Sequence, residues 1–316
     1  MNKKDISIVI PIFNEKESLP ELLNEVVQIL EEQFNYEIIC VDDGSTDGSE
    51  EILRQYASNN PRIMVTRFLR NYGKSSALTE GFKLARGKYV ITMDADLQDD
   101  PNEIPNLISK IEEGFDLVSG WKKKRLDPLS KRLPSKFFNF TTRLLTGIKI
   151  HDFNCGLKAY RNEVVKSMKI QGGMHRYVPV LVGKIGFKVT EMEVNHRPRK
   201  YGETKYGGAR YFHGLFDLLT VLFLSRYMRR PLHLFGIFGI LSFLIGFIVN
   251  CWVLYLKYGL GEPFSKHLAL LVFGVMLLIL GVQFISLGLL GEMIARSQPP
   301  SEEQMKQVIR ETKQST

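Results

Sequence analysis

Short apolar runs alternate with segments of helical spacing between residues 6 and 119. The apolar runs predict strands, and the segments whose apolar residues recur every three or four positions predict helices. Strands are expected at Ile6–Ile12, Tyr36–Val41, Ile63–Phe68, Tyr89–Met93 and Asp116–Ser119, and helices at Glu17–Glu32, Asp47–Tyr56, Ser75–Arg86 and Pro101–Glu113. Gly87 and Gly114 are expected to end the helices that precede them. The alternation indicates an α/β domain with a mostly parallel sheet covered on both faces, whose ligands bind beyond the carboxyl ends of the strands.

Two stretches near the end of the chain contain no charged residue, from Leu234 to Leu256 and from Leu268 to Gly291. Each is longer than the roughly 20 residues that cross about 30 Å of hydrocarbon. Because the link between them is short, they are expected to form a two-helix transmembrane hairpin; the alternative is a pair of buried core helices. The apolar surface of such a hairpin can pack against a second copy, which predicts a homo-oligomer.

Basic residues flank the two spans unequally. Three arginines shortly precede the first span and four basic residues follow the second, whereas the connecting link has two lysines. The positive-inside tendency therefore predicts that both termini are cytoplasmic and that the link lies outside. The first residues lack the apolar core of a secretory signal, so we expect a multi-pass protein of the inner (plasma) membrane whose N-terminal domain stays in the cytoplasm.

The expected domain boundaries follow from these elements. Residues 1–210 are predicted to form the cytoplasmic α/β domain, residues 231–293 the two spans and residues 294–316 a cytoplasmic tail. Residues 211–230 carry apolar side chains at helical spacing among basic ones. They are expected to form an amphipathic juxtamembrane helix in the membrane interface; the alternative is a core helix of the α/β domain.

The composition narrows the class of protein. Of 316 residues, 42 are Lys or Arg and 34 are Asp or Glu, which gives a net charge of +8, and 44% are hydrophobic. These values exclude a disordered or collagen-like chain. The three cysteines are odd in number and lack metal-ligand spacing, which argues against a disulfide framework and against a zinc site.

Much of the positive charge lies in residues 122–143 and 197–230. The first of these segments, the basic belt, holds eight basic residues: Lys122, Lys123, Lys124, Arg125, Lys131, Arg132, Lys136 and Arg143. On a membrane protein this belt is expected to meet anionic headgroups and a lipid phosphate. The alternatives are a plain solvated surface and, least favoured, a nucleic-acid site.

Acidic residues follow two of the predicted strands. Asp94 and Asp96 come directly after Tyr89–Met93, and a spacing of two places both side chains on one side of an extended chain. Adjacent carboxylates with open coordination positions suit Mg²⁺ or Mn²⁺ bound to a phosphate, and Gln98 offers another oxygen. The alternative for this acidic pair is a solvated turn.

Asp42 and Asp43 follow the second predicted strand in the segment DDGSTDG. This segment predicts an Asx turn, and it leaves a carboxylate that can accept hydrogen bonds from a base or a ribose. Asn14 and Glu15 follow the first predicted strand in the same way.

Four segments in this order and spacing carry a resemblance to a known family. They are IVIPIFNE (8–15), VDDGSTDGS (41–49), RNYGKSSAL (70–78) and MDADLQDDP (93–101). Together they resemble the family 2 glycosyltransferases of the GT-A (Rossmann-like) fold. The likeness continues through DLVSGWKKKR (116–125), HDFNCGLKAYR (151–161) and RKYGETKYG (199–207), and with the two spans it reaches about residue 291. The chain looks like a polyprenyl-phosphate glycosyltransferase, most similar to the bactoprenol glucosyltransferases and similar to the dolichol-phosphate mannose synthases and the aminoarabinose transferases.

The resemblance implies a role for each candidate residue. The nucleoside would be held by Pro11, Phe13, Glu15 and Asp43, with Asp42 supporting the turn. The rest of the nucleotide sugar would meet Asp94, Ala95 and Asp96, with the metal on Asp94, Asp96 and Gln98. The phosphates would be covered by Arg199 and Lys205. The lipid phosphate would be held by Lys122, Arg125, Arg132 and Ser135.

The resemblance also implies an inverting reaction, in which an oxygen of the lipid phosphate attacks the anomeric carbon and the nucleoside diphosphate leaves. A phosphate monoester is already ionised at neutral pH, so no strong general base is required. Asp152 is expected to orient the sugar hydroxyls or the acceptor; the alternative is a structural turn. The favoured donor is UDP-glucose and the acceptor is undecaprenyl phosphate, which gives a lipid-linked donor for O-antigen, lipopolysaccharide or cell-wall glycosylation.

Other functions are less favoured. A mannose-synthase-like enzyme and an aminoarabinose transferase are alternatives within the same class. A processive polysaccharide synthase would carry Gln-x-x-Arg-Trp, and neither Trp121 nor Trp252 stands in that context. A non-catalytic subunit that binds the lipid carrier would have no need of Asp94 and Asp96. His175, His196 and His213 are expected to be structural or surface residues.

Overall fold

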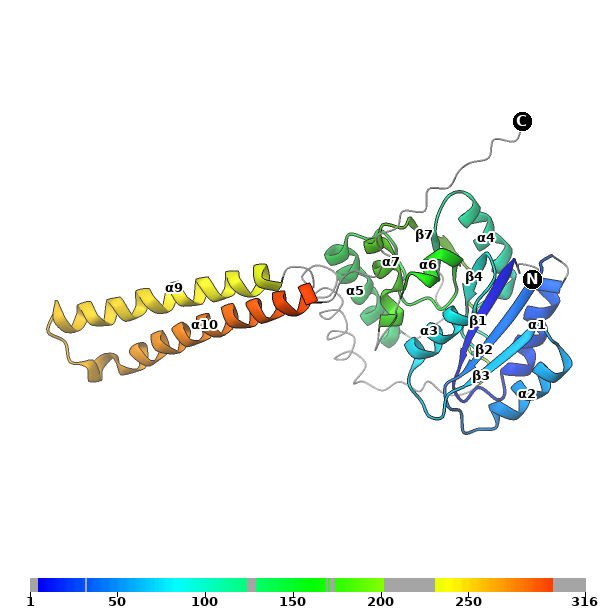
Figure 1. The fold of residues 1–316 in the computed structure, drawn as a ribbon, viewed down its shortest axis with the longest axis horizontal. Coiled ribbons are helices and arrows are strands. Elements are labelled where there is room, and N and C mark those ends of the chain that lie inside the picture. The colour runs from blue at the N-terminus through cyan, green and yellow to red at the C-terminus, as the bar shows by residue number, and fades with distance from the viewer. Residues whose placement is uncertain are drawn as a thin grey trace, which may run out of the picture. The chain divides into compact units, whose positions relative to one another are not determined.

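The computed structural model describes residues 5–31, 33–123, 129–168, 170, 174–201 and 231–297. The chain divides into two compact units, residues 1–221 and residues 222–316. The first unit is built on a seven-stranded sheet (Figure 1). Its strands are β1 (Ile6–Ile12), β2 (Tyr36–Asp42), β3 (Ile63–Arg67), β4 (Tyr89–Thr92), β5 (Leu117–Trp121), β6 (Lys158–Arg161) and β7 (Val189–Glu193). Its helices are α1 (Leu19–Glu31), α2 (Ser49–Asn59), α3 (Lys74–Leu84), η1 (Pro101–Glu103), α4 (Ile104–Glu112), α5 (Leu129–Thr146), α6 (Asn162–Lys166), η2 (Met174–Tyr177) and α7 (Val178–Ile185).

The sheet has the strand order β3-β2-β1-β4-β6-β5-β7. Strand β6 runs antiparallel to both of its neighbours, and the remaining pairs are parallel. The predicted α/β domain with a mostly parallel sheet is therefore confirmed. Because β1 pairs with both β2 and β4, the loops after these three strands emerge at one edge of the sheet.

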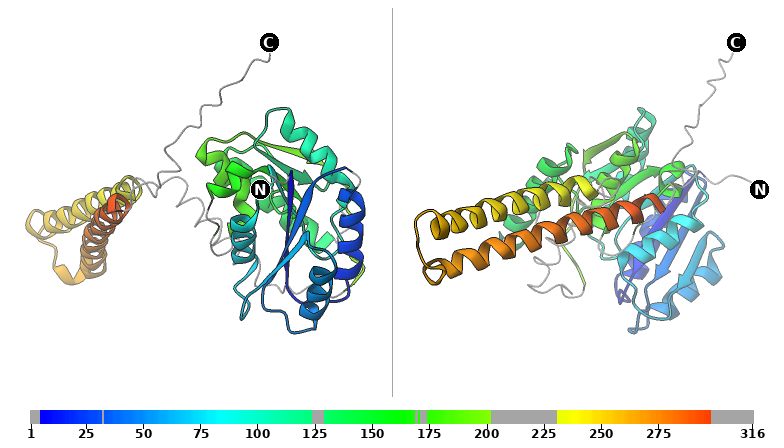
Figure 2. Two further views of the ribbon diagram at one scale, coloured as in Figure 1. Left: turned by 45° about the vertical axis from the view of Figure 1, so that its right-hand side comes forward. Right: turned by 60° about the vertical axis from the view of Figure 1, so that its left-hand side comes forward.

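Helices cover both faces of this sheet (Figure 2). The alternation of side chains along β1 shows how each face is filled, since Ile8 and Ile10 pack on one side with α1 and α4, and Val9 packs on the other with α3. All three are fully buried. Burial on both faces explains why β1 appears in the sequence as a mostly apolar run, interrupted only by Ser7.

The two glycines that were expected to end helices differ. Gly114 follows α4 with a φ of 107°, the left-handed conformation that glycine adopts at low cost, so this prediction is confirmed. The prediction for Gly87 is wrong, because α3 ends at Leu84 and Gly87 lies against β1. A Cβ at Gly87 would lie 2.6 Å from the backbone of Ile6, and its N–H donates to Ser7 Oγ at 2.7 Å. Close backbone approach, rather than a helix end, requires glycine at this position.

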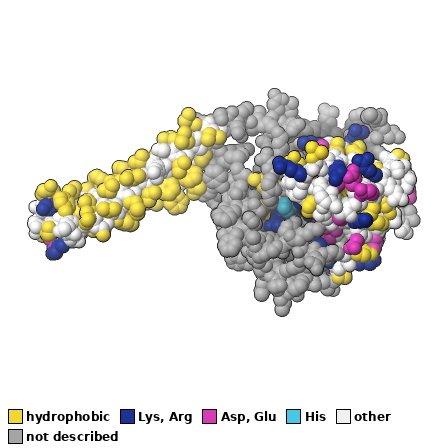
Figure 3. Space-filling model, turned by 90° about the horizontal axis from the view of Figure 1, so that it is seen from below, with side chains coloured by type: hydrophobic (Ala, Val, Ile, Leu, Met, Phe, Trp, Pro, Cys, Tyr) yellow, Lys and Arg dark blue, Asp and Glu magenta, His cyan; other side chains and the backbone are white. Residues whose placement is uncertain are grey.

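The second unit is a helical hairpin of α9 (Pro231–Tyr258), η4 (Phe264–His267) and α10 (Leu268–Ser297). Both long helices have the length and hydropathy needed to cross a membrane, and most of their apolar side chains are exposed (Figure 3). The two helices touch at glycines: a Cβ on Gly246 would lie 2.7 Å from the carbonyl oxygen of Gly274, and one on Gly281 2.8 Å from that of Gly239. Small residues allow such close packing between helices in lipid. The predicted hairpin is confirmed, and its exposed surface contradicts the alternative of buried core helices.

The cysteines and the remaining segments complete the description. Cys40 and Cys155 are buried in the first unit, Cys251 is exposed on the hairpin, and all three are free thiols. The predicted juxtamembrane helix at 211–230 lies outside the described residues, as does the tail beyond residue 297. The membrane orientation of the termini stays a prediction.

Candidate functional site

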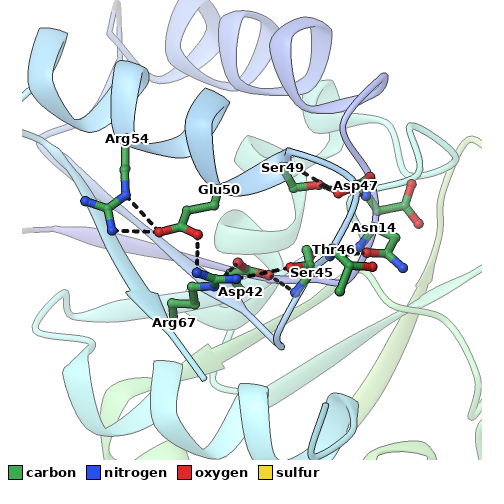
Figure 4. Close-up of polar contacts among 10 residues, drawn as sticks. Asn14, Asp42, Ser45, Thr46, Asp47, Ser49, Glu50, Arg54 and Arg67 are labelled. Atoms are coloured by element: carbon green, nitrogen blue, oxygen red, sulfur yellow. Dashed lines mark hydrogen bonds and ion pairs between the residues drawn. The ribbon is translucent and has the colours of Figure 1, made fainter. Parts of the chain in front are cut away.

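The loop after β2 is tied to the loop after β1 (Figure 4). The side-chain oxygen of Asn14 accepts the N–H of Thr46 at 2.8 Å, and the N–H of Asn14 donates to Ser45 Oγ at 2.9 Å. Asn14 has a φ of 54°, in the left-handed region that asparagine tolerates better than most residues. The two loops therefore fix each other's shape where the nucleoside is expected.

Asp42 belongs to the same network (Figure 4). Its Oδ1 accepts the N–H of Ser45 at 2.9 Å, and its Oδ2 lies 3.3 Å from Nε of Arg67, which also pairs with Glu50. The side chain is 1% exposed. Its carboxylate is thus positioned to support the turn, and a direct contact with the nucleotide stays a prediction.

Asp43 shapes the loop that leads into α3. Its two carboxylate oxygens accept the N–H groups of Tyr72 at 2.7 Å and Gly73 at 2.8 Å. Burial raises the pKa of Asp43, while these two N–H groups act in the opposite direction. An ionised carboxylate accepts up to about four hydrogen bonds, so Asp43 keeps capacity for a donor group of a base. For Pro11, Phe13 and Glu15 the nucleoside role stays a prediction.

The loop after β4 brings Asp94 and Asp96 together, and each meets a basic side chain from a distant part of the chain. Lys74, the first residue of α3, forms an ion pair with Asp94. Arg199 Nη2 lies 2.5 Å from Asp96 Oδ2. The side chain of Asp96 is only 12% exposed, which does not fit the alternative of a solvated turn.

The turn after Asp96 is strained. Leu97 has a φ of 60°, a conformation that costs a non-glycine residue on the order of 1–3 kcal/mol. The N–H of Gln98 donates to Asp96 Oδ1 at 3.2 Å, and the carbonyl oxygen of Gln98 accepts the N–H of Arg197 at 3.0 Å. The backbone of Gln98 therefore holds the loop in shape, and its side chain as a metal ligand stays a prediction.

The two carboxylates ionise differently. Burial opposes the charge of Asp94, but Lys74 and two further lysines outweigh it and lower the pKa of Asp94 to about 2. Burial and then the charge of Asp94 raise the pKa of Asp96 to about 6. Two carboxylates that repel one another are stabilised by a cation placed between them.

This donor set fits Mg²⁺ or Mn²⁺ accompanied by substrate phosphates. Mg²⁺ in such sites binds one or two carboxylates and fills its other positions with water and phosphate oxygens. Asp94 and Asp96 supply two carboxylates, and among the described residues no group of three His, Cys, Asp or Glu side chains is placed to hold a metal. Ala95 lies between them and is buried. Lys205 lies outside the described residues, so only Arg199 of the predicted basic pair is placed at the site.

A buried ion pair connects this loop to the end of β5. Lys122 Nζ lies 2.8 Å from Asp99 Oδ1, and the two side chains are 12% and 0% exposed. Asp99 Oδ2 accepts the N–H of Asp94 at 3.1 Å. The side chain of Lys122 is largely buried and holds the loop that carries Asp94, and its predicted role toward the lipid phosphate stays a prediction.

Lys122 also reaches a cavity of about 460 Å³, here called the large cavity. Its other lining residues are Trp121, Lys123, Ser135, Lys136, Asn139, Phe140, Arg143, His151 and Asp152. Basic side chains and a hydroxyl lie there beside Phe140 and the stacked rings of Trp121 and His151, 4.4 Å apart. The predicted residues Lys122 and Ser135 are thus brought together, whereas Arg125 and the side chain of Arg132 lie outside the described residues.

Asp152 lies in the wall of the large cavity and is 2% exposed. Its Oδ1 accepts the N–H of Asn154 at 3.0 Å, so the Asx turn that was the alternative for this residue is present. The turn and a role toward a ligand are compatible, because a carboxylate has further acceptor positions.

Three residues around the acidic pair were not predicted as site residues: Lys74, Asp99 and Lys158. Lys74 and Asp99 lie inside RNYGKSSAL and MDADLQDDP, so their place in a motif was the available signal. Lys158 stands between the apolar Leu157 and Ala159 in a short strand, and a lysine in such a context indicates a buried charge.

Solved structures resemble the first unit. Glucosyl-3-phosphoglycerate synthase of Mycobacterium tuberculosis, determined with Mn²⁺, UDP-glucose and phosphoglyceric acid, matches with a TM-score of 0.55 over 69% of this chain and 80% of that chain, at 20% identity. The same enzyme with Mg²⁺ and UDP matches with a TM-score of 0.54. The fold is therefore GT-A.

The family follows from the sequence comparisons. The model of Glycosyl transferase family 2 matches residues 7–168, and the chain belongs to this family. Dodecaprenyl-phosphate galacturonate synthase of Rhizobium johnstonii is 38% identical over 93% of this chain and 88% of its own length. Undecaprenyl-phosphate 4-deoxy-4-formamido-L-arabinose transferase of Pseudomonas savastanoi pv. phaseolicola is 37% identical over 93% of this chain and 86% of its own.

Gly156 gives a first prediction about this site. A Cβ at position 156 would lie 2.5 Å from Asp94 Cγ, so Gly156→Ala must displace the Asp94 carboxylate. A displacement of about 1 Å can cost about 10²-fold in rate, and we expect a loss of this size in the initial rate of sugar transfer. Gly236→Ala is the control, because its Cβ would meet nothing closer than 3.7 Å. Equal rates for both variants would show that Gly156 does not position Asp94.

His175 gives a second prediction. Burial, and then the charge of Lys74, lower the pKa of His175 to about 3, and its Nδ1 lies 3.1 Å from Ser75 Oγ. In the unfolded chain His175 binds a proton near pH 6.5, whereas in the folded chain it stays neutral down to about pH 3. The neutral side chain therefore contributes fully to folding stability above pH 6.5. As the pH falls toward 3, the free energy of unfolding decreases by up to about 1.4 kcal/mol per pH unit. Urea unfolding of wild type and His175→Gln between pH 7.5 and 4.5 checks this. Parallel pH curves for the two proteins would contradict it.

Proposed function

We propose that the protein transfers a sugar from a nucleotide sugar to polyprenyl phosphate. The observation that carries the proposal is the position of the large cavity, whose wall residue Lys122 is bonded through Asp99 to the loop of Asp94. A cavity with basic, hydroxyl and aromatic walls fits a phosphate attached to a hydrocarbon chain. The two curated relatives described above, named for dodecaprenyl and undecaprenyl phosphate, support the same acceptor.

The donor is proposed to bind across the loops after β1, β2 and β4. Asp43 and the residues after β1 face the nucleoside, and Asp94 and Asp96 hold Mg²⁺ or Mn²⁺. When bound, the metal neutralises charge that develops on the departing diphosphate. Arg199, already on Asp96, adds a positive charge near the leaving group, and Lys205 is proposed to join it.

The transfer is proposed to be a single displacement with inversion. A phosphate oxygen of the acceptor forms a bond to the anomeric carbon as the bond from that carbon to the diphosphate breaks. The acceptor phosphate is ionised at neutral pH, so the chain needs no strong base. Asp152, in the wall of the large cavity, is proposed to orient the acceptor or the sugar hydroxyls.

The identity of the transferred sugar is proposed from the relatives and from the family resemblance. The family resemblance favours UDP-glucose, but the relatives named for galacturonate and formamido-arabinose transfer support a modified sugar, which makes the aminoarabinose-type alternative the closer candidate. The hairpin of α9 and α10 is proposed to anchor the chain in the inner membrane with both termini cytoplasmic, and to pack against further copies. No nucleic-acid partner is proposed.

The test uses the purified full chain in lipid nanodiscs with undecaprenyl phosphate, Mg²⁺ or Mn²⁺, and a panel of nucleotide sugars. We expect one sugar to appear on the lipid phosphate by mass spectrometry, with release of the nucleoside diphosphate. Nucleotide-sugar consumption without a glycosylated lipid would exclude the acceptor. If the assay shows neither nucleotide-sugar consumption nor a glycosylated lipid, the result would favour a non-catalytic subunit that binds the lipid carrier.

A further inference from the structure

A second and smaller cavity of about 110 Å³, here called the small cavity, lies beside Asp94. The side chains in its wall that carry chemistry are Lys74, Asp94, Asn154, Lys158, His175 and Arg176. Its volume is several times the roughly 10–15 Å³ that one water molecule requires, so it admits a small polar group. Pro11 and Asp94, which are predicted to meet the nucleoside and the metal, also line this cavity, but no predicted substrate contact uses Lys158, His175 or Arg176.

Lys158 is an unusual residue for such a wall. It is 4% exposed, and its Nζ donates to the carbonyl oxygen of Cys155. Within the described residues no carboxylate forms an ion pair with it. Burial lowers the pKa of Lys158, because the charged form is poorly solvated there, while the charges of Asp152 and Asp94 act in the opposite direction. A buried ammonium is stable only when a counter-charge or sufficient hydrogen bonds compensate the lost water.

The rest of the wall adds positive charge without adding a matching acid. Arg176 comes from η2, and in the described part of the chain it has no acidic partner. Asp94 is the one acidic residue in the wall, and it is already paired with Lys74. His175 is neutral at physiological pH because its pKa is lowered to about 3, so it offers hydrogen bonding without charge. The wall therefore carries more positive than negative charge.

We propose that the small cavity is a subsite for one anionic oxygen group of a substrate, a carboxylate or a phosphate, bound by Lys158 and Arg176 next to Asp94. Charge-assisted hydrogen bonds from both residues to this group would add to the hydrogen bond that Lys158 makes with the Cys155 carbonyl. The proposal rests on the proposed function, whose substrates offer three such groups: the donor diphosphate, the acceptor phosphate and, in a uronic acid donor, the sugar carboxylate.

The test compares Arg176→Gln and Arg176→Lys with wild type in the full chain in nanodiscs. Arg176 is partly exposed, so neither change is expected to impair folding. Calorimetry with Mg²⁺ measures the affinity for UDP, UDP-glucose and UDP-galacturonate, and a kinetic assay measures the KM for undecaprenyl phosphate. Loss of a charge-assisted hydrogen bond in Arg176→Gln should weaken one of these interactions by about tenfold or more, with partial recovery in Arg176→Lys.

The pattern of loss identifies the anion. Weaker binding of UDP-galacturonate alone indicates a sugar carboxylate. Equal weakening of all three nucleotides indicates the donor diphosphate. A raised KM for undecaprenyl phosphate with unchanged nucleotide binding indicates the acceptor phosphate. If all affinities and the KM are unchanged, the cavity holds no anion and the proposal is overturned.

Lys158→Met extends the test, with Lys166→Met as its matched control. Lys166 also donates to backbone carbonyls, those of Phe82 and Lys83 at 2.7 Å, but it does not line the small cavity. Lys158→Met should reproduce the loss of Arg176→Gln, and Lys166→Met should not. The same loss in both would reflect a structural effect of removing a lysine and would overturn the proposal. If wild type binds the nucleotides but glycosylates no lipid, the proposed function fails while the nucleotide measurements still test the subsite.

Discussion

Asp94→Asn is expected to lower the rate of sugar transfer by at least about 10³-fold, because several kcal/mol of charge stabilisation depend on the metal at this carboxylate. The substitution keeps the size of the side chain and removes its charge. Lys74 loses its ion-pair partner, but both side chains are about a third exposed, at 27% and 31%, so we expect little change in folding stability. Initial rates measure sugar transfer, a thermal unfolding curve measures folding stability, and a membrane-retention assay tests whether the variant stays bound to the membrane.

Asp116→Asn is the matched control for this variant. Asp116 also pairs with a basic residue, Arg161 at 3.3 Å, but it lies at the amino end of β5, at the opposite edge of the sheet from Asp94. The Asp116→Asn variant should therefore keep the sugar-transfer rate of wild type. Full activity of Asp94→Asn in a folded protein would remove Asp94 from the metal site and with it the proposed donor geometry.

Lys122→Met is expected to lower the free energy of unfolding by about 3–5 kcal/mol, since it leaves the buried carboxylate of Asp99 without its counter-charge. Both side chains are almost fully enclosed, at 12% and 0% exposure. The charge of Asp99 is the main cause that raises the pKa of Lys122 against the effect of burial. Chemical unfolding of the purified chain measures the change.

Two further variants separate the ion pair from the loss of a lysine. Lys123→Met removes an exposed lysine that pairs with Glu193 at 3.0 Å, and should cost at most about 1 kcal/mol. The double variant Lys122→Met/Asp99→Leu should recover part of the lost stability, because it removes the unpaired charge. A double variant no more stable than Lys122→Met would argue that Lys122 stabilises the fold by packing alone.

Much of the fold could be predicted because periodicity is a local property of the sequence. Strand β1 was predicted with its observed ends, and β2 and β4 within one residue, since each is a mostly apolar run of strand length, interrupted only by Ser7 in β1 and Glu37 in β2. The prediction for Gly87 was wrong because its requirement comes from the backbone of Ile6, which lies far away in the sequence. Strand β6 was not predicted, because it is short and contains both Lys158 and Arg161.

In the candidate site, too, features set by the local sequence could be predicted and features set by distant residues could not. Asp94 and Asp96 could be predicted because both lie in one motif at the end of a strand. The partners that fix their charge, Lys74 and Arg199, come from segments 20 and 103 residues away, and only the fold brings them together. The ion pair of Lys122 with the buried Asp99 was not predicted either, because no sequence pattern shows that these two side chains meet.

The three cysteines described above make the natural chain suitable for single-site chemical labelling. Burial raises the pKa values of Cys40 and Cys155 to about 12, so neither forms the reactive thiolate at neutral pH. Cys251 alone is exposed, on the surface of α9. A lipophilic maleimide should therefore attach one fluorophore per chain without mutagenesis, and depth-dependent quenchers in the bilayer could then report how far that position lies from each membrane surface.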